Sequence, residues 1–341
     1  MFWNIFSRKK KRIRKKKKLS PEEELRSVLK KYHLSNLELN ILKVAEPCFS
    51  IDSLKEELSH KAGSSRIAGN PDLPKNWDWP RDDDGGYYTF LAQINLGELD
   101  MSKNCYLPNK GMLYFFLGSE EHVSAIHKVL YFDGDLVKLI STDMPDGKSY
   151  NDIYGDWREF QIVNPIFKKA LSSVCHILME IIPDKNNTIW ANDESPEHKA
   201  NDELNLLLSN ERTQLGGLPK TYLGDPQMTA YLYKNGLDNL QYFHYRDLKD
   251  VDEEIAKKKK NKKNVKEVIE LQKSRKELAK YKKEEKEHIK RSKDWVSLFI
   301  LASEDKANMS WGDAGLLFFL IHKDDLKKRD FSNTFCTLEC S

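Results

Sequence analysis

The spacing of apolar positions predicts two helices near the start of the chain. In the first, apolar residues recur every three or four positions, which puts them on one face of a helix: Leu25, Val28, Leu29 and Tyr32. Ser20 and Glu23 match a capping box, and Pro21 suits the first helical position. A second helix is expected over 37–44.

Strands are predicted further along, where aromatic and β-branched runs alternate with turn residues. The segment 64–86 is dense in Gly, Pro and Asp, which excludes a long helix there. Three apolar runs follow: YYTFLAQINL at 87–96, GMLYFFLGS at 111–119 and KVLYF at 128–132. Asp133-Gly134 is interpreted as a hairpin turn leading from the third run into DLVKL.

Three landmarks of the first half return in the same order in the second. The pairs are RIAGNPDLP (66–74) with TQLGGLPKTY (213–222), TFLAQINLGE (89–98) with WVSLFILASED (295–305), and NKGMLYFFLG (109–118) with GDAGLLFFLIH (312–322). We therefore expect an α+β, mainly antiparallel β domain over 19–341, in which two repeats share one core. The repeats are placed at about 62–165 and about 170–341.

A charged insert at 247–293 interrupts the second repeat. It holds 18 Lys/Arg against 11 Asp/Glu, and its apolar residues are sparse. Lys and Glu favour helices, and the like-charged run at 257–264 is consistent with the tip of a helical hairpin. The predicted hairpin projects into solvent, either as a solvated excursion or as a handle for an acidic partner or RNA.

Charge is distributed unevenly over the 341 residues. The net charge is +3, but residues 8–18 contain 10 Lys/Arg and no acid. Outside this arm and the insert, 28 bases face 42 acids, so the body of the molecule is acidic. An acidic body argues against nucleic-acid binding across its face. No apolar run is long enough for a transmembrane helix.

The first 18 residues form a basic, flexible arm with aromatic side chains at its start. Its candidate contact residues are Phe2, Trp3, Phe6, Arg8, Lys9, Lys10 and Lys11. Aromatics beside a polybasic run suit an anionic membrane surface, and a basic block also binds RNA phosphates. A disordered tail without a partner is the favoured interpretation, and the RNA-binding arm is the third.

Five widely spaced cysteines and scattered histidines give no metal pattern. There is no CxxC pair, no paired-histidine zinc motif and no cleavable signal sequence, so reduced thiols in a cytoplasm are expected. Cys336 and Cys340 are expected on one face of a strand as small buried side chains. The protein is thus predicted to be cytoplasmic, with peripheral attachment to the inner membrane face as an option.

The landmarks resemble the YwqG-like family of largely uncharacterised bacterial proteins. The resemblance rests on SSRIAGNPDLP followed by W-x-W-P, on FLAQINL, on LPNKGMLYFF and on the C-terminal stretch from MSWGDAGLLFF to Ser341. It implies a mainly antiparallel β roll, barrel-like, built from two related halves with helices at the ends. It implies no known activity.

This chain departs from the family pattern at several positions. Ala68 stands where the first turn of the family has Gly, and Thr213 stands near the usual His. Ile300 and Ala302 replace the family's Gln and Asp in the second-half strand, whereas Gln93 is retained in the first half. A site built on that polar pair has therefore lost half of its groups.

No catalytic constellation emerges from the sequence. The acids Asp72, Asp78 and 82–84 form a loop of oxygen ligands, but their spacing is not that of a calcium loop, and solvated turn acids are expected. Cys175-His176 would point to opposite faces of a strand. Phosphate-binding and dinucleotide-binding glycine loops are absent. We expect no cofactor and no metal.

The most distinctive short motif is WGDAG at 311–315. Its aspartate either caps a tight turn or presents a carboxylate in a cleft between the repeats. The candidate ligand-binding residues of that cleft are Trp311, Asp313, Gln93, Gly216, Gly217, Asp225 and Asp72. The favoured hypothesis is a non-enzymatic module that binds another protein there. An enzyme acting on a small molecule or modified peptide, and RNA or membrane association through 1–18 and 247–293, are the alternatives.

Overall fold

A computed structural model describes most of the chain. The described residues are 19–56, 61–83, 85–101, 106–118, 124–145, 160–173, 178, 181–182, 195–208, 213–218, 224–260 and 265–340. The candidate contact residues of the basic arm lie outside these ranges, as do Asp84, Cys105 and the Cys175-His176 pair.

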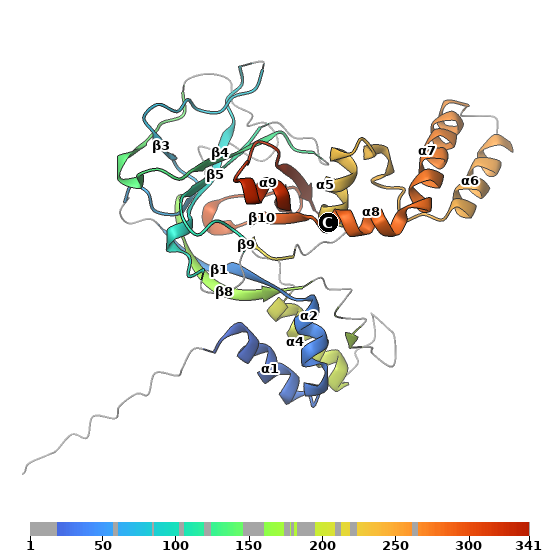
Figure 1. Cartoon of the computed structure of the whole chain (residues 1–341), viewed down its shortest axis with the longest axis horizontal. Coiled ribbons are helices and arrows are strands. Elements are labelled where there is room, and N and C mark those ends of the chain that lie inside the picture. The colour runs from blue at the N-terminus through green and yellow to red at the C-terminus, as the bar shows by residue number, and fades with distance from the viewer. Residues whose placement is uncertain are drawn as a thin grey trace, which may run out of the picture.

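The described residues form eight helices and twelve strands (Figure 1). The helices are α1 (Pro21–Lys31), α2 (Glu38–Val44), α4 (Pro196–Leu208), α5 (Pro226–Lys234), α6 (Leu248–Lys260), α7 (Val265–Lys283), α8 (Glu285–Ser292) and α9 (Lys323–Lys328). The strands are β1 (Glu46–Glu56), β2 (Arg66–Ile67), β3 (Asp72–Pro74), β4 (Thr89–Asn95), β5 (Met112–Leu117), β6 (His127–Phe132), β7 (Leu139–Ser141), β8 (Val163–Ser172), β9 (Gln214–Gly216), β10 (Trp295–Ala302), β11 (Leu316–His322) and β12 (Phe335–Glu339).

Local sequence explains the first helix. The Ser20 hydroxyl accepts from the Glu23 N–H at 3.2 Å, and the Glu23 carboxylate accepts from the Ser20 N–H at 2.8 Å. These reciprocal bonds satisfy two donors that a helix start leaves open, which confirms the predicted capping box. The predicted second helix is also confirmed, as α2.

Ten antiparallel strands form one large sheet, in the order β12-β11-β10-β9-β1-β8-β2-β4-β5-β6. The long strands β1 and β8 pair at its centre, with four strands on either side. β1 comes before β2 in sequence but pairs with β9, and β8 comes before β9 but pairs with β2. The long strands are therefore exchanged between the halves. The strands β9 to β12 of the second half join β1, which comes from the first half, and β2 and β4 to β6 of the first half join β8. The α+β, mainly antiparallel β prediction is confirmed.

The sheet curls until its two edge strands approach each other, so the barrel is nearly closed. The Ala125 N–H donates to the Cys336 carbonyl oxygen at 2.9 Å across this seam. One step further, the His127 ring Nε2 lies 2.9 Å from Thr334 Oγ1, and its Nδ1 lies 2.8 Å from the Ala125 carbonyl oxygen. Burial lowers the pKa of His127 to about 4, with help from a nearby lysine, Lys234.

Apolar layers line both faces of the curled sheet. The inner core holds side chains from both sides, with the Phe115 ring 4.7 Å from Phe299 and 5.1 Å from Phe319. Outside, α5 covers β10 and β11 while α6 and α7 extend away from the sheet (Figure 1), α1 and α4 pack near β8, and the two-stranded sheet β3-β7 covers β4 and β5.

The hairpin predicted at Asp133-Gly134 is wrong. Within the described ranges β6 pairs with β5 alone, and β7 pairs with β3 in the small sheet, with Leu73 opposite Ile140. The turn residues are present, but β7 meets its partner through tertiary packing. Leu139 is buried in the outer cluster beside Leu73. The adjacent exposed side chains, such as Val137, are left in solvent.

Candidate functional site

A buried polar cluster surrounds Asp72 at the start of β3. The Asp72 N–H donates to Gln93 Oε1 at 2.7 Å, and Gln93 Nε2 donates back to Asp72 Oδ2 at 2.8 Å. The same carboxylate accepts from the Gly63 N–H at 2.9 Å and from Arg66 Nη2 at 3.3 Å. The Tyr114 hydroxyl donates to the Asp72 carbonyl oxygen at 2.5 Å. The structure thus brings two predicted site residues, Asp72 and Gln93, into direct contact.

The cluster is closed to solvent. The side chains of Arg66 and Asp72 are 4% and 0% exposed, and Gln93 and Tyr114 are fully buried. Burial raises the pKa of Tyr114, and the nearby Asp72 charge adds to this effect. The expectation that Asp72 is a solvated turn acid is therefore wrong: its charge is buried and compensated by an arginine six residues earlier. Such a buried, hydrogen-bonded pair holds a loop in place.

A tight turn between Arg66 and Asp72 makes this pairing possible. Ala68 and Gly69 have φ values of 62° and 70°, which reverse the chain within two residues. The Arg66 guanidinium can therefore donate to the Asn70 carbonyl oxygen as well as to Asp72. Arg66 and this turn were missed as site components, although an Arg and an Asp flanking an Ala-Gly pair were visible in the sequence.

The matching turn in the second half contains Gly216 and Gly217. Their φ values are 68° and 76°, like those of the first turn. A Cβ on Gly217 would lie 2.2 Å from Ser172 Oγ and 2.8 Å from Cys48 Cβ, so only glycine fits. These glycines shape the chain beside β1 and β8.

Ile300 occupies the strand position that corresponds to Gln93. A register shift lies between Phe90 and Ala92 in β4, and a similar one lies between Ser297 and Phe299 in β10. Ile300 is buried in the apolar layer between β10 and α5. The polar cluster of the first half thus has an apolar counterpart in the second half.

The other predicted site residues lie on separate elements. The Trp311 side chain is 1% exposed in the inner core, and the Trp311 backbone N–H donates to Ser303 Oγ at 2.9 Å. Asp313 lies on an exposed turn that follows it. Asp225 caps α5, because its carboxylate accepts from the Gln227 N–H at 2.9 Å. Trp311 and Asp225 therefore have local structural roles.

The space between the two sides of the sheet is filled by the inner core. The aromatic contacts of Phe115 with Phe299 and Phe319 lie there, with Trp311 in the same cluster. Across the described residues, no group of three or more His, Cys, Asp or Glu could hold a metal ion. Cys48 and Cys336 are buried, and Cys340 is partly exposed.

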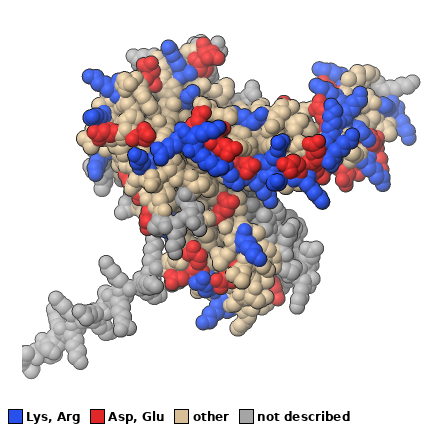
Figure 2. Space-filling model, viewed as in Figure 1, with Lys and Arg blue, Asp and Glu red and all other residues tan. Residues whose placement is uncertain are grey.

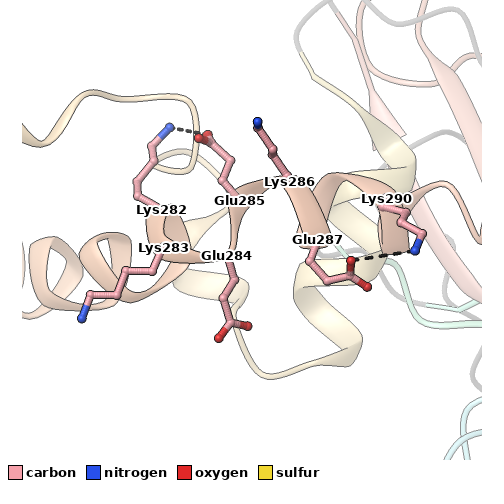
Figure 3. A pocket seen from close by; sticks show the side chains of 7 residues that line it. All are labelled: Lys282, Lys283, Glu284, Glu285, Lys286, Glu287 and Lys290. Atoms are coloured by element: carbon pink, nitrogen blue, oxygen red, sulfur yellow. Dashed lines mark hydrogen bonds and ion pairs between the residues drawn. The ribbon is translucent and has the colours of Figure 1, made fainter.

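A hollow lies instead at the corner between α7 and α8 (Figure 3). Its lining residues are Lys282, Lys283, Glu284, Glu285, Lys286, Glu287 and Lys290. Two of the lysines are neutralised, since Lys282 lies 2.5 Å from Glu285 and Lys290 lies 3.9 Å from Glu287. The hollow is open and charged, unlike the buried cluster around Asp72.

An aromatic stack lies under this corner. The rings of Tyr281 and His288 are parallel to within 5° at 4.6 Å, and the Tyr231 hydroxyl lies 2.7 Å from His288 Nδ1. Burial raises the pKa of Tyr281 to about 12, and the nearby Glu285 adds to the shift. The stack fixes the angle between α7 and α8.

No helix in the described ranges is both long enough and apolar enough to cross a membrane.

The comparison with family models identifies the chain's relatives. No curated protein matches it. A model described as a domain of unknown function, DUF1963, matches residues 65–340 and so includes the large sheet from β2 to β12 and the charged insert. The closer resemblance to YwqG-like proteins stays a prediction. By this match over most of its length, the chain belongs to the DUF1963 family, an uncharacterised family.

Proposed function

We propose that the protein is a non-enzymatic binding module that contacts its partner through the charged insert α6 to α8. The observation behind this proposal is a row of exposed lysines on α7: Lys273, Lys276, Lys280 and Lys283. Their spacing of three and four residues puts them on one face of the helix, over about 15 Å.

The opposite face of α7 packs against α6 and against the 3₁₀ helix at Asp238–Leu240. Leu271, Leu278 and Tyr281 are buried in the apolar layer that also contains Ile300 and Phe318 of the sheet. A helix fixed on one face and basic on the other presents its charges in a constant geometry. Figure 2 shows Lys and Arg side chains gathering over α7 and α8, with Asp and Glu between them.

Neighbouring cations of the insert are already paired. Arg275 donates to both carboxylate oxygens of Asp252 at 2.8 and 2.7 Å, and Lys258 pairs with Glu267 and Glu254. Among the described residues, none of the four lysines in the row takes part in an ion pair. Their charge is therefore available to an acidic partner.

The buried cluster around Asp72 supports a binding role over an enzymatic one. A catalytic acid or base needs access to substrate, whereas Asp72 and Gln93 bond to each other and to backbone groups in a closed interior. The sequence favoured a cleft between the halves as the main contact surface. Aromatic side chains fill that interior, so the proposed contact surface is the insert.

A pull-down from native cytosol and membrane fractions tests the proposal. The full chain is compared with K273Q/K276Q/K280Q/K283Q and with a matched control, K61Q/K75Q/K110Q/K138Q, whose lysines are exposed on the body. We expect a defined partner to be captured by the wild type and the control and to be lost from the insert variant. Equal capture by all three proteins would overturn the proposal.

A further inference from the structure

We propose that the insert binds single-stranded RNA, whose bases stack on Tyr242 and Tyr245 while its phosphates contact the lysine row of α7. This inference rests on the proposed function, since it takes the insert as the contact surface and names the partner class. Exposed aromatics beside a basic helix are the two components of a sequence-tolerant single-strand site.

The two tyrosines project from a turn between the 3₁₀ helix at Asp238–Leu240 and α6. Tyr242 is 64% exposed and Tyr245 is 71% exposed, which is unusual for such large side chains. The intervening Phe243 is turned inward and packs against the outer apolar layer. The turn thus holds two aromatic faces in solvent at a separation of three residues.

The turn is held by backbone hydrogen bonds and by the Arg246 side chain. The Phe243 and His244 N–H groups both donate to the Leu240 carbonyl oxygen, at 2.9 and 2.8 Å. The Arg246 guanidinium lies 5.1 Å from the Phe243 ring and donates to Glu254 of α6 at 2.8 Å. A platform that is already ordered loses little conformational entropy when a base stacks on it.

An aromatic contact joins this turn to the basic helix. The His244 ring lies 6.2 Å from Tyr281, edge to face, and Tyr281 stacks on His288 of α8. Lys280 and Lys283 flank Tyr281 in sequence, at the end of the lysine row. Because Tyr281 belongs to the buried face of α7, the tyrosine turn lies against that side of the helix, level with Lys280 and Lys283, and a bound strand would pass around the end of α7 from the tyrosines to the row.

The corner retains positive charge after its own pairs are counted. Glu285 is paired with Lys282, and Glu287 is paired with Lys290. Lys283 and Lys286 have no ion pair among the described residues, and Glu284 offsets one of these two charges, so the corner keeps a net positive charge. Figure 3 shows the Lys283 and Lys286 side chains reaching out on opposite sides of the helical corner. These two ammonium groups can contact phosphates on either side of a stacked base.

Three features favour a single strand over other polyanions. A duplex keeps its bases stacked inside, so it cannot use both tyrosines as platforms. A lipid surface or an acidic protein segment needs the lysines but not stacking on the tyrosine π faces. The acidic body repels a polyanion, which leaves the insert and the basic arm as the contact surfaces.

Binding of a fluorescein-labelled oligouridylate of about 15 nucleotides to the full chain, followed by anisotropy, tests the inference. We expect Y242F/Y245F to bind within about twofold of the wild type, and Y242L/Y245L to bind at least about tenfold more weakly, because leucine cannot stack with a base. Circular dichroism verifies that each variant is folded.

Salt dependence measures the phosphate contacts separately. Between about 50 and about 200 mM salt, K273Q/K276Q/K280Q/K283Q should reduce the slope of log affinity against log salt by about three, because each phosphate contact with a single strand contributes about 0.7. Y242L/Y245L should leave the slope unchanged. The Phe and Leu substitutions of the tyrosines should differ in affinity by the same factor when they are combined with the body control K61Q/K75Q/K110Q/K138Q or with the arm variant K9Q/K10Q/K11Q.

Several results would overturn the inference. One is no binding of the oligouridylate by the wild type; another is equal binding by the Leu and Phe variants. Insert-dependent binding to phosphatidylserine vesicles or polyglutamate without oligouridylate binding would identify a lipid or an acidic protein as the partner class. In that case the proposed binding function of the insert stands and the RNA assignment fails. If the insert variant captured the same partners as the wild type in the pull-down, both the proposed binding function of the insert and the RNA assignment would fail.

Discussion

Replacing Asp72 with Asn would test whether the buried cluster holds the first half of the sheet together. Asp72 accepts from Arg66, Gln93 and the Gly63 N–H, so both of its carboxylate oxygens face donors. An asparagine has only one acceptor oxygen, and its amide NH₂ would face a donor in either orientation. It would also leave the Arg66 charge buried without its counter-ion.

The expected loss is large because the pair is almost fully buried. Side-chain exposures of 4% and 0% put Arg66 and Asp72 in the class of buried ion pairs, where removal of one partner costs about 3–5 kcal/mol. An exposed acid of the same loop, Asp83, provides the control, and D83N should change stability by less than about 0.5 kcal/mol.

Urea denaturation followed by tryptophan fluorescence measures both variants. The R66M/D72N double variant completes a cycle, since it removes the stranded charge. We expect it to lose less than the sum of the single variants by about 1–3 kcal/mol. A D72N loss below about 1 kcal/mol, or strict additivity in the cycle, would refute the assignment of a buried, mutually dependent pair.

Two further predictions concern the centre and the seam of the barrel. G217A should destabilise the fold by more than about 2 kcal/mol, because its Cβ would overlap Ser172 Oγ at a positive φ. G236A is the control, since Gly236 also has a positive φ but has open space around its Cβ. A loss of similar size in G236A would contradict the explanation by overlap. His127 has a folded pKa of about 4 and an unfolded value near 6.5, so the unfolded chain binds more protons between these pH values and stability should fall as pH falls through this window, by about 3 kcal/mol in all. Urea denaturation at several pH values should show H127Q flattening this dependence, and an unchanged slope would exclude His127 as its source.

Local signals predicted the elements that local interactions determine. The capping residues Ser20 and Glu23 fixed the start of α1, and the Lys- and Glu-rich composition predicted the helices of the insert. The apolar runs that begin near Thr89 and Met112 became β4 and β5. The spacing of apolar residues and the capping residues are sufficient in such segments because the competing local conformations are less stable.

Partners that are distant in sequence were not predictable in the same way. The Asp133-Gly134 turn was interpreted as a hairpin, yet β7 pairs with β3, more than 60 residues earlier. The burial of Asp72 depends on Arg66 and on the reversal at Ala68-Gly69, whose φ values no composition reveals. The exposed Tyr242 and Tyr245 were not singled out, because their exposure depends on how Phe243 and His244 pack.

The exchange of long strands has a consequence for biosynthesis. β1 leaves the ribosome early, but its two neighbours, β8 and β9, are made more than 100 residues later. The centre of the sheet therefore cannot assemble until most of the chain has been translated, and β1 needs protection from wrong pairing during that interval. A gene split between β7 and β8 would produce two polypeptides, each holding the strand that the other needs. Neither would complete its sheet alone, and the two together would form an obligate heterodimer.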